Sequence, residues 1–325
     1  MHKANCSRRV SRKSARYMRS LYPLHRDSNR TGGFHLEISI ICVPFQIDVG
    51  RWGCALGPQA YLNAGLIDRL RSAGHTVIDP VWIELPNKER TRDTITNLGR
   101  IAHYTSEQVS AALHNPDRIA LVLEGDCNHA PGAIGGVAQA CGSAGVAWFD
   151  AHGDMATMET TTSGMIGGMP YAVALGWEFA DWREAAGLDT PVRPEAAALL
   201  GTSDLDPGEI AALQTHPILH LDAHELTHAN VSERVAQAFR PRLNEAAGWY
   251  VHIDLDVAGP EVVPGALTPA PYWPPRQNLL EAAATLGHLL PIKALSLAAY
   301  NPSSDPGKLG SIFGIEMAMA VIGTS

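Results

Sequence analysis

The 325-residue sequence predicts an α/β fold, with a mostly parallel β-sheet that helices cover on both faces. From residue 36 onward, short β-prone runs alternate with helical patterns, and most of these runs are continuously apolar. Continuous apolar strands are typical of sheets that are buried on both faces. With 46% hydrophobic and 18% charged residues, the chain can bury a sizeable core.

The expected strands are short runs rich in aliphatic and aromatic residues. They are Leu36–Val43, Thr76–Ile78, Arg118–Leu123, Gly145–Phe149, Ala198–Gly201, Ile218–Leu221, Trp249–Ile253 and Lys293–Leu297. The expected helices are Pro58–Ser72, Thr105–His114, Val231–Phe239, Gln277–Leu290 and Ser311–Ile322. The Pro-rich segment Thr268–Pro275 is short, so we interpret it as a rigid loop over a site and not as a domain boundary.

The first 30 residues differ in charge from the rest of the chain. They carry nine of the 25 Lys and Arg residues and one of the 33 Asp and Glu residues, so the remainder has a formal charge of −16. They contain no apolar core of a secretory signal. We expect residues 1–35 to be a disordered basic extension and residues 36–325 to form one catalytic domain. A transit peptide, or translation from an upstream start with Met18 as the true start, remain alternatives.

Charge, hydropathy and cysteine usage limit the class of protein. An acidic body argues against nucleic acid as a partner. No apolar run reaches the ~18 residues that a membrane span needs, so we expect no membrane partner. The five cysteines are scattered and form no CxxC pair, which favours a reducing, cytoplasmic compartment.

Two acidic clusters follow apolar strands. Asp150, His152 and Asp154 come directly after one strand, and Asp254 and Asp256 come at the end of another. If the chain stays extended, alternate residues share one face. Four carboxylates on one surface repel one another unless a cation lies between them. The pattern therefore predicts a metal site with two divalent ions.

A third polar segment, residues 124–129, follows the expected strand Arg118–Leu123. In parallel α/β sheets, ligands bind beyond the carboxyl ends of the strands. The three polar segments can therefore converge on one crevice.

These segments resemble the three signatures of the arginase/agmatinase (ureohydrolase) family, Gly-Gly-Asp-His-Ser, Asp-Ala-His-x-Asp and Ser-x-Asp-x-Asp. The matching segments here are Glu124–Asn128, Asp150–Asp154 and His252–Asp256. The resemblance covers roughly residues 37–302 and implies a three-layer α/β/α fold around an eight-stranded, mostly parallel sheet. It also implies a two-ion site, with Mn²⁺ as the expected metal. The implied ligands are Cys127, Asp150, His152, Asp154, Asp254 and Asp256.

The resemblance further implies a reaction. A hydroxide that bridges the two ions would attack a guanidino-type carbon and release urea or a urea derivative, and Asp154 would act as the catalytic residue that accepts its hydrogen bond. The partner would be a small guanidino-type substrate, and the protein would form a homo-oligomer.

Cys127 is the first departure from the family, which usually has a His ligand there. A thiolate ligand is soft and favours Zn²⁺ or Fe²⁺ over Mn²⁺. A two-residue shift would offer His129 instead, and Cys127 could also be a small buried hydrophobe without a metal bond. We expect His252 to pack beside the ligands and not to bind metal itself.

The substrate segment departs further. Ser163 and Asp206 match family residues that bind a substrate's α-carboxylate and α-amino group, although Asp206 could instead be a helix N-cap before a proline. In contrast, Ala156 and Met165 replace two Asn residues, and Gly167 replaces a proton-shuttling His. A glycine has no group that could protonate a leaving amine.

Ala299 stands where the family has a Glu that pairs with the guanidinium. The Cys ligand and the Gly-Gly pair at 167–168 are similar to the Nω-hydroxy-arginine amidinohydrolase branch, whose N-hydroxyguanidine substrate is less basic. That branch keeps the Glu, so Ala299 departs from it as well and leaves the assignment open. We therefore expect hydrolysis of a guanidino or N-hydroxyguanidino C–N bond, with a role in specialised metabolism. The alternatives are a catalytically drifted arginase-like binding subunit and a zinc deacetylase-type hydrolase.

Overall fold

The computed structural model describes residues 35–266, 268 and 270–323. Phe34–Ser325 form one compact unit. The basic extension expected over residues 1–35 falls, apart from its last residue, outside the described part of the chain. None of the described helices is long and apolar enough to cross a membrane.

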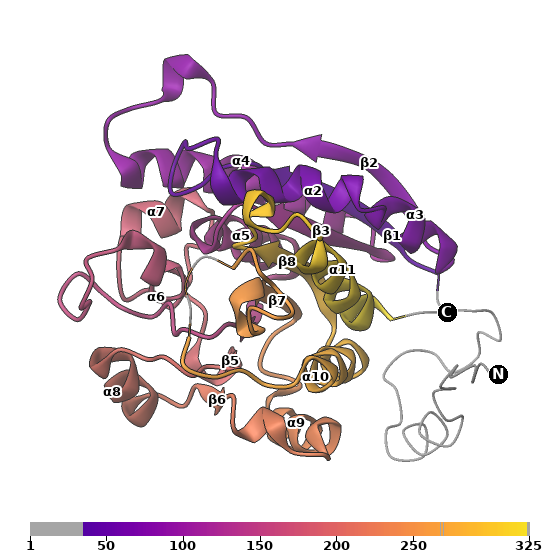
Figure 1. The fold of residues 1–325 in the computed structure, drawn as a ribbon. Coiled ribbons are helices and arrows are strands. Elements are labelled where there is room, and N and C mark those ends of the chain that lie inside the picture. The colour runs from indigo at the N-terminus through magenta and orange to yellow at the C-terminus, as the bar shows by residue number, and fades with distance from the viewer. Residues whose placement is uncertain (1–34, 267, 269, 324–325) are drawn as a thin grey trace. The chain divides into compact units, whose positions relative to one another are not determined.

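The fold class predicted from the sequence is confirmed (Figure 1). Eight parallel strands form one sheet in the order β2-β1-β3-β8-β7-β4-β5-β6. Their bounds are β1 Glu37–Val43, β2 Thr76–Trp82, β3 Arg118–Glu124, β4 Ala144–Phe149, β5 Ala197–Leu200, β6 Leu219–Leu221, β7 Gly248–Asp254 and β8 Ile292–Ala298. Every expected strand is therefore present, with ends that differ by a few residues.

The apolar pattern of the strands follows their position in the sheet. The central strands β4 and β7 are buried along their whole length, as continuous apolar runs predict. The edge strand β2 exposes most of its residues, and the opposite edge strand β6 is only three residues long. The short length of β6, and Asp79 and Pro80 within β2, limit pairing with other chains.

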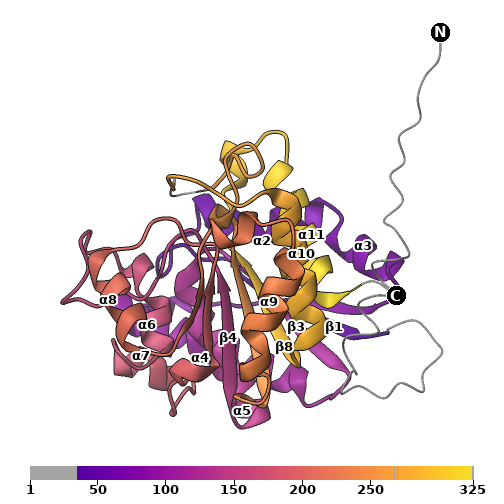
Figure 2. The ribbon, with the colours of Figure 1, turned by 90° about the horizontal axis from the view of Figure 1, so that it is seen from below.

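Helices cover both faces of the sheet (Figures 1 and 2). One apolar core joins the sheet to α2 Gly57–Asn63, α3 Leu66–Ser72, α9 Val231–Phe239, α10 Arg276–Leu289 and α11 Leu309–Ile322. The core on the other face contains α4 Thr94–Leu113, α5 Ala130–Cys141 and α6 Pro170–Ala174, and α7 Ala180–Ala185 packs against α4. Helix α8, Pro207–Thr215, follows β5.

Several helical expectations need correction. Helix α4 begins at Thr94 and not at the expected Thr105, and α6, α7 and α8 were not expected. The single helix expected over Pro58–Ser72 is broken, because Gly65 adopts a left-handed φ of 87° between α2 and α3. Helix α5 was not expected, because glycines lower helix propensity. A Cβ at Gly132 or Gly136 would come within 3 Å of α4, so close packing between the two helices requires these glycines.

The sheet order places four strand ends side by side. Strands β3, β8, β7 and β4 are neighbours at the centre of the sheet. Because all are parallel, their carboxyl ends meet at one edge, where α/β sheets bind ligands. The two acidic clusters and the polar segment 124–129, together called the three acidic segments below, all follow strands of this group.

Candidate metal centre

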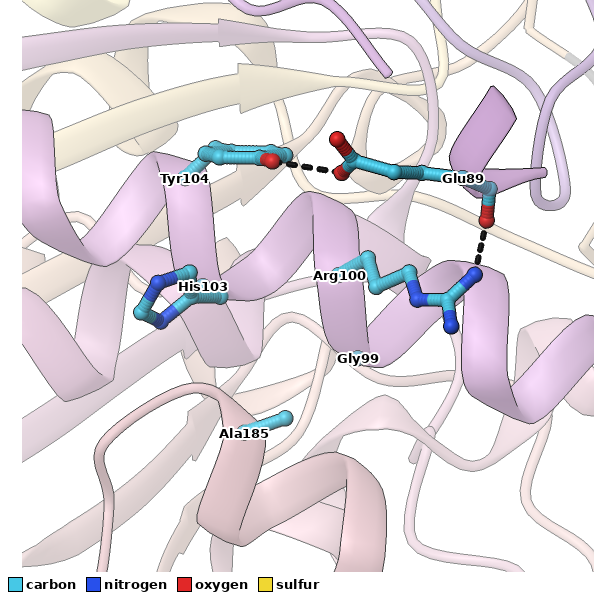
Figure 3. A pocket seen from close by; sticks show the side chains of 6 residues that line it. All are labelled: Glu89, Gly99, Arg100, His103, Tyr104 and Ala185. Carbon is cyan, nitrogen blue, oxygen red and sulfur yellow. Dashed lines mark hydrogen bonds between the residues drawn. The ribbon is translucent and has the colours of Figure 1, made fainter. Parts of the chain in front are cut away.

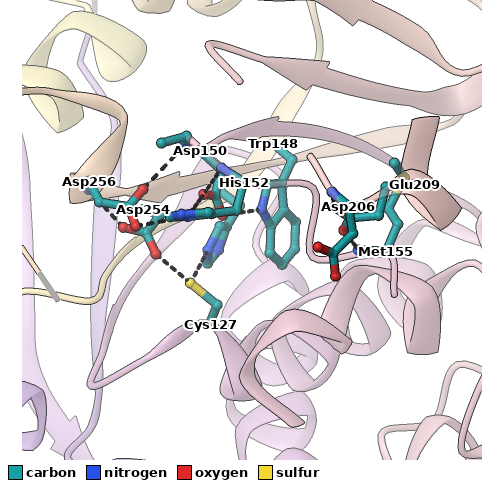
Figure 4. A network of polar contacts seen from close by, with 11 residues as sticks. Cys127, Trp148, Asp150, His152, Met155, Asp206, Glu209, Asp254 and Asp256 are labelled. Carbon is teal, nitrogen blue, oxygen red and sulfur yellow. Dashed lines mark hydrogen bonds and ion pairs between the residues drawn. The ribbon is translucent and has the colours of Figure 1, made fainter. Parts of the chain in front are cut away.

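The predicted ligands lie on turns that follow the central strands. Cys127 begins a 3₁₀ turn, Cys127–His129, just after β3. Asp150 follows β4, Asp254 ends β7, and Asp256 lies in the 3₁₀ turn Leu255–Val257. Their side chains point toward one another in Figure 4, although they come from three strands.

An extended chain is not what aligns these side chains. The chain leaves the extended conformation after Phe149, and Asp154 adopts a left-handed φ of 50°. Asp150 accepts a hydrogen bond from the amide of His152 at 2.7 Å, and Asp254 accepts one from the amide of Asp256, also at 2.7 Å. Aspartates often form such local turns, and here the turns orient the cluster.

Potential metal donors form two groups that share one residue. Donor atoms of Cys127, Asp150 and Asp154 all lie within 4.8 Å of one another, and so do those of Asp150, His152 and Asp256. Nδ1 of His152 lies 3.3 Å from Oδ1 of Asp150 and 3.1 Å from Oδ2 of Asp256. Asp150 thus lies between the two groups.

Asp254 joins the cluster through Cys127, whose sulfur lies 2.8 Å from its Oδ2. The structure therefore brings together all six residues that the sequence suggested as ligands. Oxygen, imidazole and thiolate donors at this spacing fit divalent transition metals.

The electrostatics of the cluster also fit bound cations. In their absence, burial and neighbouring carboxylates raise the pKa of Asp150 and raise the pKa values of Asp154 and Asp254 well above the usual range. Burial opposes the charge of His152, but Asp150 and Asp256 outweigh it and raise the pKa of His152 to about 12. Divalent ions would relieve the repulsion that causes these shifts.

His129 lies outside both donor groups. Its Nε2 lies 3.2 Å from the carbonyl oxygen of Phe45, and burial lowers the pKa of its ring to about 4. The shifted alignment that would make His129 a ligand therefore lacks geometric support, whereas Cys127 lies beside three of the aspartates, Asp150, Asp154 and Asp254.

Trp148 and Glu209 support the cluster and were not singled out from the sequence. Nε1 of Trp148 donates to Oδ2 of Asp150 at 2.9 Å. Glu209 accepts hydrogen bonds from the amides of Met155 and Asp206, each at 2.9 Å, and so ties α8 to the turn beside the cluster (Figure 4). The Asp-x-x-Glu spacing of a capping box was the signal for Glu209.

The two expected substrate residues lie on different segments: Ser163 in the loop that precedes α6, and Asp206 at the start of α8. Ser163 is exposed, and its Oγ accepts a hydrogen bond from the amide of Met165 at 3.2 Å. Asp206 begins α8 and accepts from the hydroxyl of Thr162 at 2.7 Å and from its amide at 3.2 Å. Asp206 therefore lies at the N-cap position of α8 and also holds the loop that contains Thr160, Thr161, Thr162 and Ser163, called the Thr-rich loop below.

A cavity of about 230 Å³ opens beside Asp256. Apart from Asp256 and Thr268, its lining is apolar: Ala258, Pro260, Val263, Pro264, Ala266 and Trp273. Ala266 pairs with Tyr300, the neighbour of Ala299, so this cavity lies close to the end of β8.

A larger cavity of about 310 Å³ lies on the α4 side, where Glu89, Arg100, His103 and Tyr104 line it with Gly99 and Ala185 (Figure 3). It includes no residue of the donor groups.

Comparisons with known proteins agree with this geometry. Arginase from Bacillus caldovelox is 33% identical over 239 residues, which cover 71% of this chain and 80% of that protein. Arginase from Bacillus subtilis (strain 168) is 31% identical over 237 residues, covering 71% and 79% of the two chains.

Solved structures show the same fold. The crystal structure of arginase from Bacillus subtilis superposes with a TM-score of 0.80 at 27% identity, covering 89% of this chain and 99% of that one. Proclavaminate amidino hydrolase from Streptomyces clavuligerus gives 0.67 at 21% identity, covering 92% and 93%, and so shares the fold. The sequence model of the arginase family matches residues 36–323 of this chain. This chain therefore belongs to the arginase family.

Proposed function

We propose that this protein is a metal-dependent hydrolase that cleaves a guanidino-type C–N bond and releases urea or hydroxyurea. The observation that carries the proposal is the pair of donor groups that share Asp150. Two overlapping groups suit two divalent ions. Its membership of the arginase family, with relatives named arginase, supports the reaction class.

Six residues would hold the ions: Cys127, Asp150, His152, Asp154, Asp254 and Asp256. Bound ions would supply Lewis acidity and activate a water molecule at neutral pH. We expect Mn²⁺ from the family, with Zn²⁺ or Fe²⁺ as alternatives because a thiolate prefers softer metals.

Asp154 is the residue that we assign to proton transfer. It is buried, and the amides of Tyr171 and Ala172 hold its carbonyl oxygen at 2.9 and 3.1 Å. Its carboxylate would accept the proton of the attacking water as oxygen bonds to the guanidino carbon. The same proton would reach the leaving nitrogen when the C–N bond breaks, giving an amine and a urea-type product.

The pocket favours a weakly basic guanidino group. Ala299 is buried and offers no carboxylate, and Asp256 is the sole acidic residue among those that line the neighbouring cavity. A guanidinium cation would therefore lack a free carboxylate partner. An N-hydroxyguanidine is less basic and depends less on such a partner, so it is our preferred substrate class.

Ser163 and Asp206 would bind the opposite end of an amino-acid-shaped substrate. Both lie at the Thr-rich loop, since Asp206 contacts Thr162, the neighbour of Ser163. We also infer a cytoplasmic homo-oligomer, from the family and from the scattered cysteines.

The test is a panel of guanidino and N-hydroxyguanidino compounds, assayed for urea and hydroxyurea with purified, metal-loaded protein. Asp154→Asn is the matched control, because it keeps the volume of the side chain but removes the carboxylate. We expect turnover by the parent and at least a hundredfold loss in the control. A panel without product would contradict the proposal.

The second candidate is a binding subunit without catalytic activity. Ala156, Gly167 and Ala299, which replace functional family residues, favour it. Retained metal binding together with an inert substrate panel would establish this alternative.

A further inference from the structure

Three departures from the family signatures meet at one buried point behind the metal centre. Glu124 replaces the first Gly of one signature, Cys127 replaces its His, and His252 replaces the Ser of another. Nε2 of His252 lies 3.2 Å from the sulfur of Cys127, and its Nδ1 lies 3.7 Å from Oε2 of Glu124. Position 127 lacks the imidazole of the family's His, and position 252 supplies an imidazole that faces the sulfur of Cys127.

The ring of His252 is held on every side. Its Nδ1 lies 2.8 Å from Oγ of Ser296 and 3.0 Å from Oη of Tyr250. It stacks on Trp148, with 3.8 Å between ring centroids, and it is fully buried. Trp148 in turn donates a hydrogen bond to Asp150, a predicted metal ligand. The ring of His252 therefore packs against a residue that holds this ligand in place.

The hydrogen-bond partners of His252 determine what it offers to the sulfur. Each of the hydroxyls of Ser296 and Tyr250 carries one proton, and their oxygens lie 2.5 Å apart. Tyr250 can donate to Ser296, and Ser296 can then donate to Nδ1. In this arrangement the proton of the neutral imidazole is on Nε2, which can then donate to the sulfur of Cys127.

We propose that His252 is a positioning residue that donates a hydrogen bond from Nε2 to the thiolate of Cys127 and thereby tunes this sulfur as a metal ligand. This inference rests on the proposed metal site. His252 contacts the sulfur and belongs to neither donor group, so it acts through Cys127 and not as a ligand itself.

The hydrogen bond from His252 offsets an excess of negative charge among the ligands. Four carboxylates and one thiolate carry about −5, against +4 from two divalent ions. A buried N–H donor offsets part of the excess negative charge on the sulfur. Partners of this kind orient a ligand, and their loss typically weakens metal binding by about 10- to 100-fold.

Glu124 lies on the Nδ1 side of the His252 ring. It is fully buried, with Oε2 3.7 Å from Nδ1 of His252 and with Ser296 as a second polar neighbour. Its carboxyl group fills the space behind Nδ1 of His252 that a glycine would leave empty.

The experiment uses cobalt-loaded full-length protein, prepared anaerobically. Cobalt(II) bound to a thiolate gives a sulfur-to-metal charge-transfer band, whose energy reports hydrogen bonding to the sulfur. His252→Gln keeps an N–H donor near the position of Nε2, whereas His252→Leu removes it. His129→Leu is the matched control for loss of another buried histidine, and Cys127→Ser identifies the band.

We expect the band in the parent and its absence in Cys127→Ser. His252→Leu should shift the band to lower energy and weaken zinc and cobalt binding by about 10- to 100-fold, while both ions still bind at saturation. His252→Gln should restore band energy and affinity to within a few-fold, and His129→Leu should leave the band energy unchanged.

Two results would overturn the inference. One is a His252→Leu variant with the parent's band energy and affinity. The other is the loss of one ion in both His252 variants, which would make His252 a direct ligand. These readouts do not depend on turnover, so an inert substrate panel would remove the proposed reaction and leave this inference standing.

Discussion

The sulfur of Cys127 lies 2.8 Å from Oδ2 of Asp254, although 127 positions separate the two residues in the sequence. The sheet order explains this contact, because β3 and β7 both flank β8 and end at the same edge. The contact joins two of the three acidic segments at one corner of the site. Cys127 therefore lies where a ligand to a shared metal centre would lie.

Removing metal should destabilise the protein. An ion present at 100 times its dissociation constant stabilises the folded state by about 2.7 kcal/mol, and two ions contribute more. We therefore expect a chelator to lower the melting temperature in thermal denaturation. Asp254→Asn should show a smaller chelator effect than the parent, because it lacks one metal-binding carboxylate. Equal melting curves with and without chelator would argue against a resident metal.

The loss on chelation should grow with pH. Without metal, the folded pKa values of Asp154 and Asp254 lie well above the usual range because of burial and mutual repulsion. The folded state then binds more protons than the unfolded chain above pH ~4, so its free energy of unfolding falls as the pH rises. Urea denaturation of the metal-free protein at several pH values measures this trend, and rising stability would contradict it.

Ala299→Glu should change substrate preference. A carboxylate there would pair with a guanidinium cation, a contact worth about 1.5–3 kcal/mol. We expect kcat/KM for guanidinium substrates to rise roughly 10- to 100-fold relative to N-hydroxyguanidines. Ala299→Gln is the uncharged control of the same size. If both variants change the preference equally, charge is not the cause.

Gly167→His should supply a proton donor for the leaving amine. A Cβ at Gly167 would meet no atom within 4 Å, so a side chain can be added there without displacing a neighbour. General acid catalysis typically contributes about 10²–10⁴-fold. We expect an increase in kcat for substrates with strongly basic leaving amines, measured in a leaving-group series. Gly168→His, also in open space, is the positional control. An equal increase in kcat for Gly168→His would show that the effect does not depend on a proton donor at position 167.

Asp206→Ala should raise KM while metal content stays unchanged. Asp206 holds the Thr-rich loop through Thr162 and would also bind the substrate's amino group. Thr162→Val separates the two roles, because it removes the hydroxyl contact and leaves the carboxylate. A KM increase of about tenfold in Asp206→Ala alone supports the substrate role. The same increase in both variants would assign the effect to the loop.

Much of the fold could be predicted from the sequence, because continuous apolar strands and their order along the chain are local signals. All eight strands were expected, but α6, α7, α8 and the first half of α4 were missed, and so was α5. Its glycines are unfavourable in an isolated helix and become favourable only against α4. Such tertiary packing leaves no local signal.

The candidate site shows the same division. The residue types and spacing of the two acidic clusters were sufficient to predict a metal site, and the resemblance to the arginase family added Cys127 as a ligand. The way in which these side chains meet could not be predicted, because the left-handed turn at Asp154 and the Asp150 and Asp254 turns replace the extended chain that spacing alone suggests. The contact of His252 with Cys127 depends on strand register, which the sequence does not specify.

The most direct test of this account is the number of metal ions per chain. It should be measured on protein prepared anaerobically and loaded with Mn²⁺, beside Cys127→Ser. The account predicts two ions in the parent and fewer in the variant, because Cys127 belongs to one of the two donor groups. A parent without tightly bound metal would contradict the proposed hydrolase.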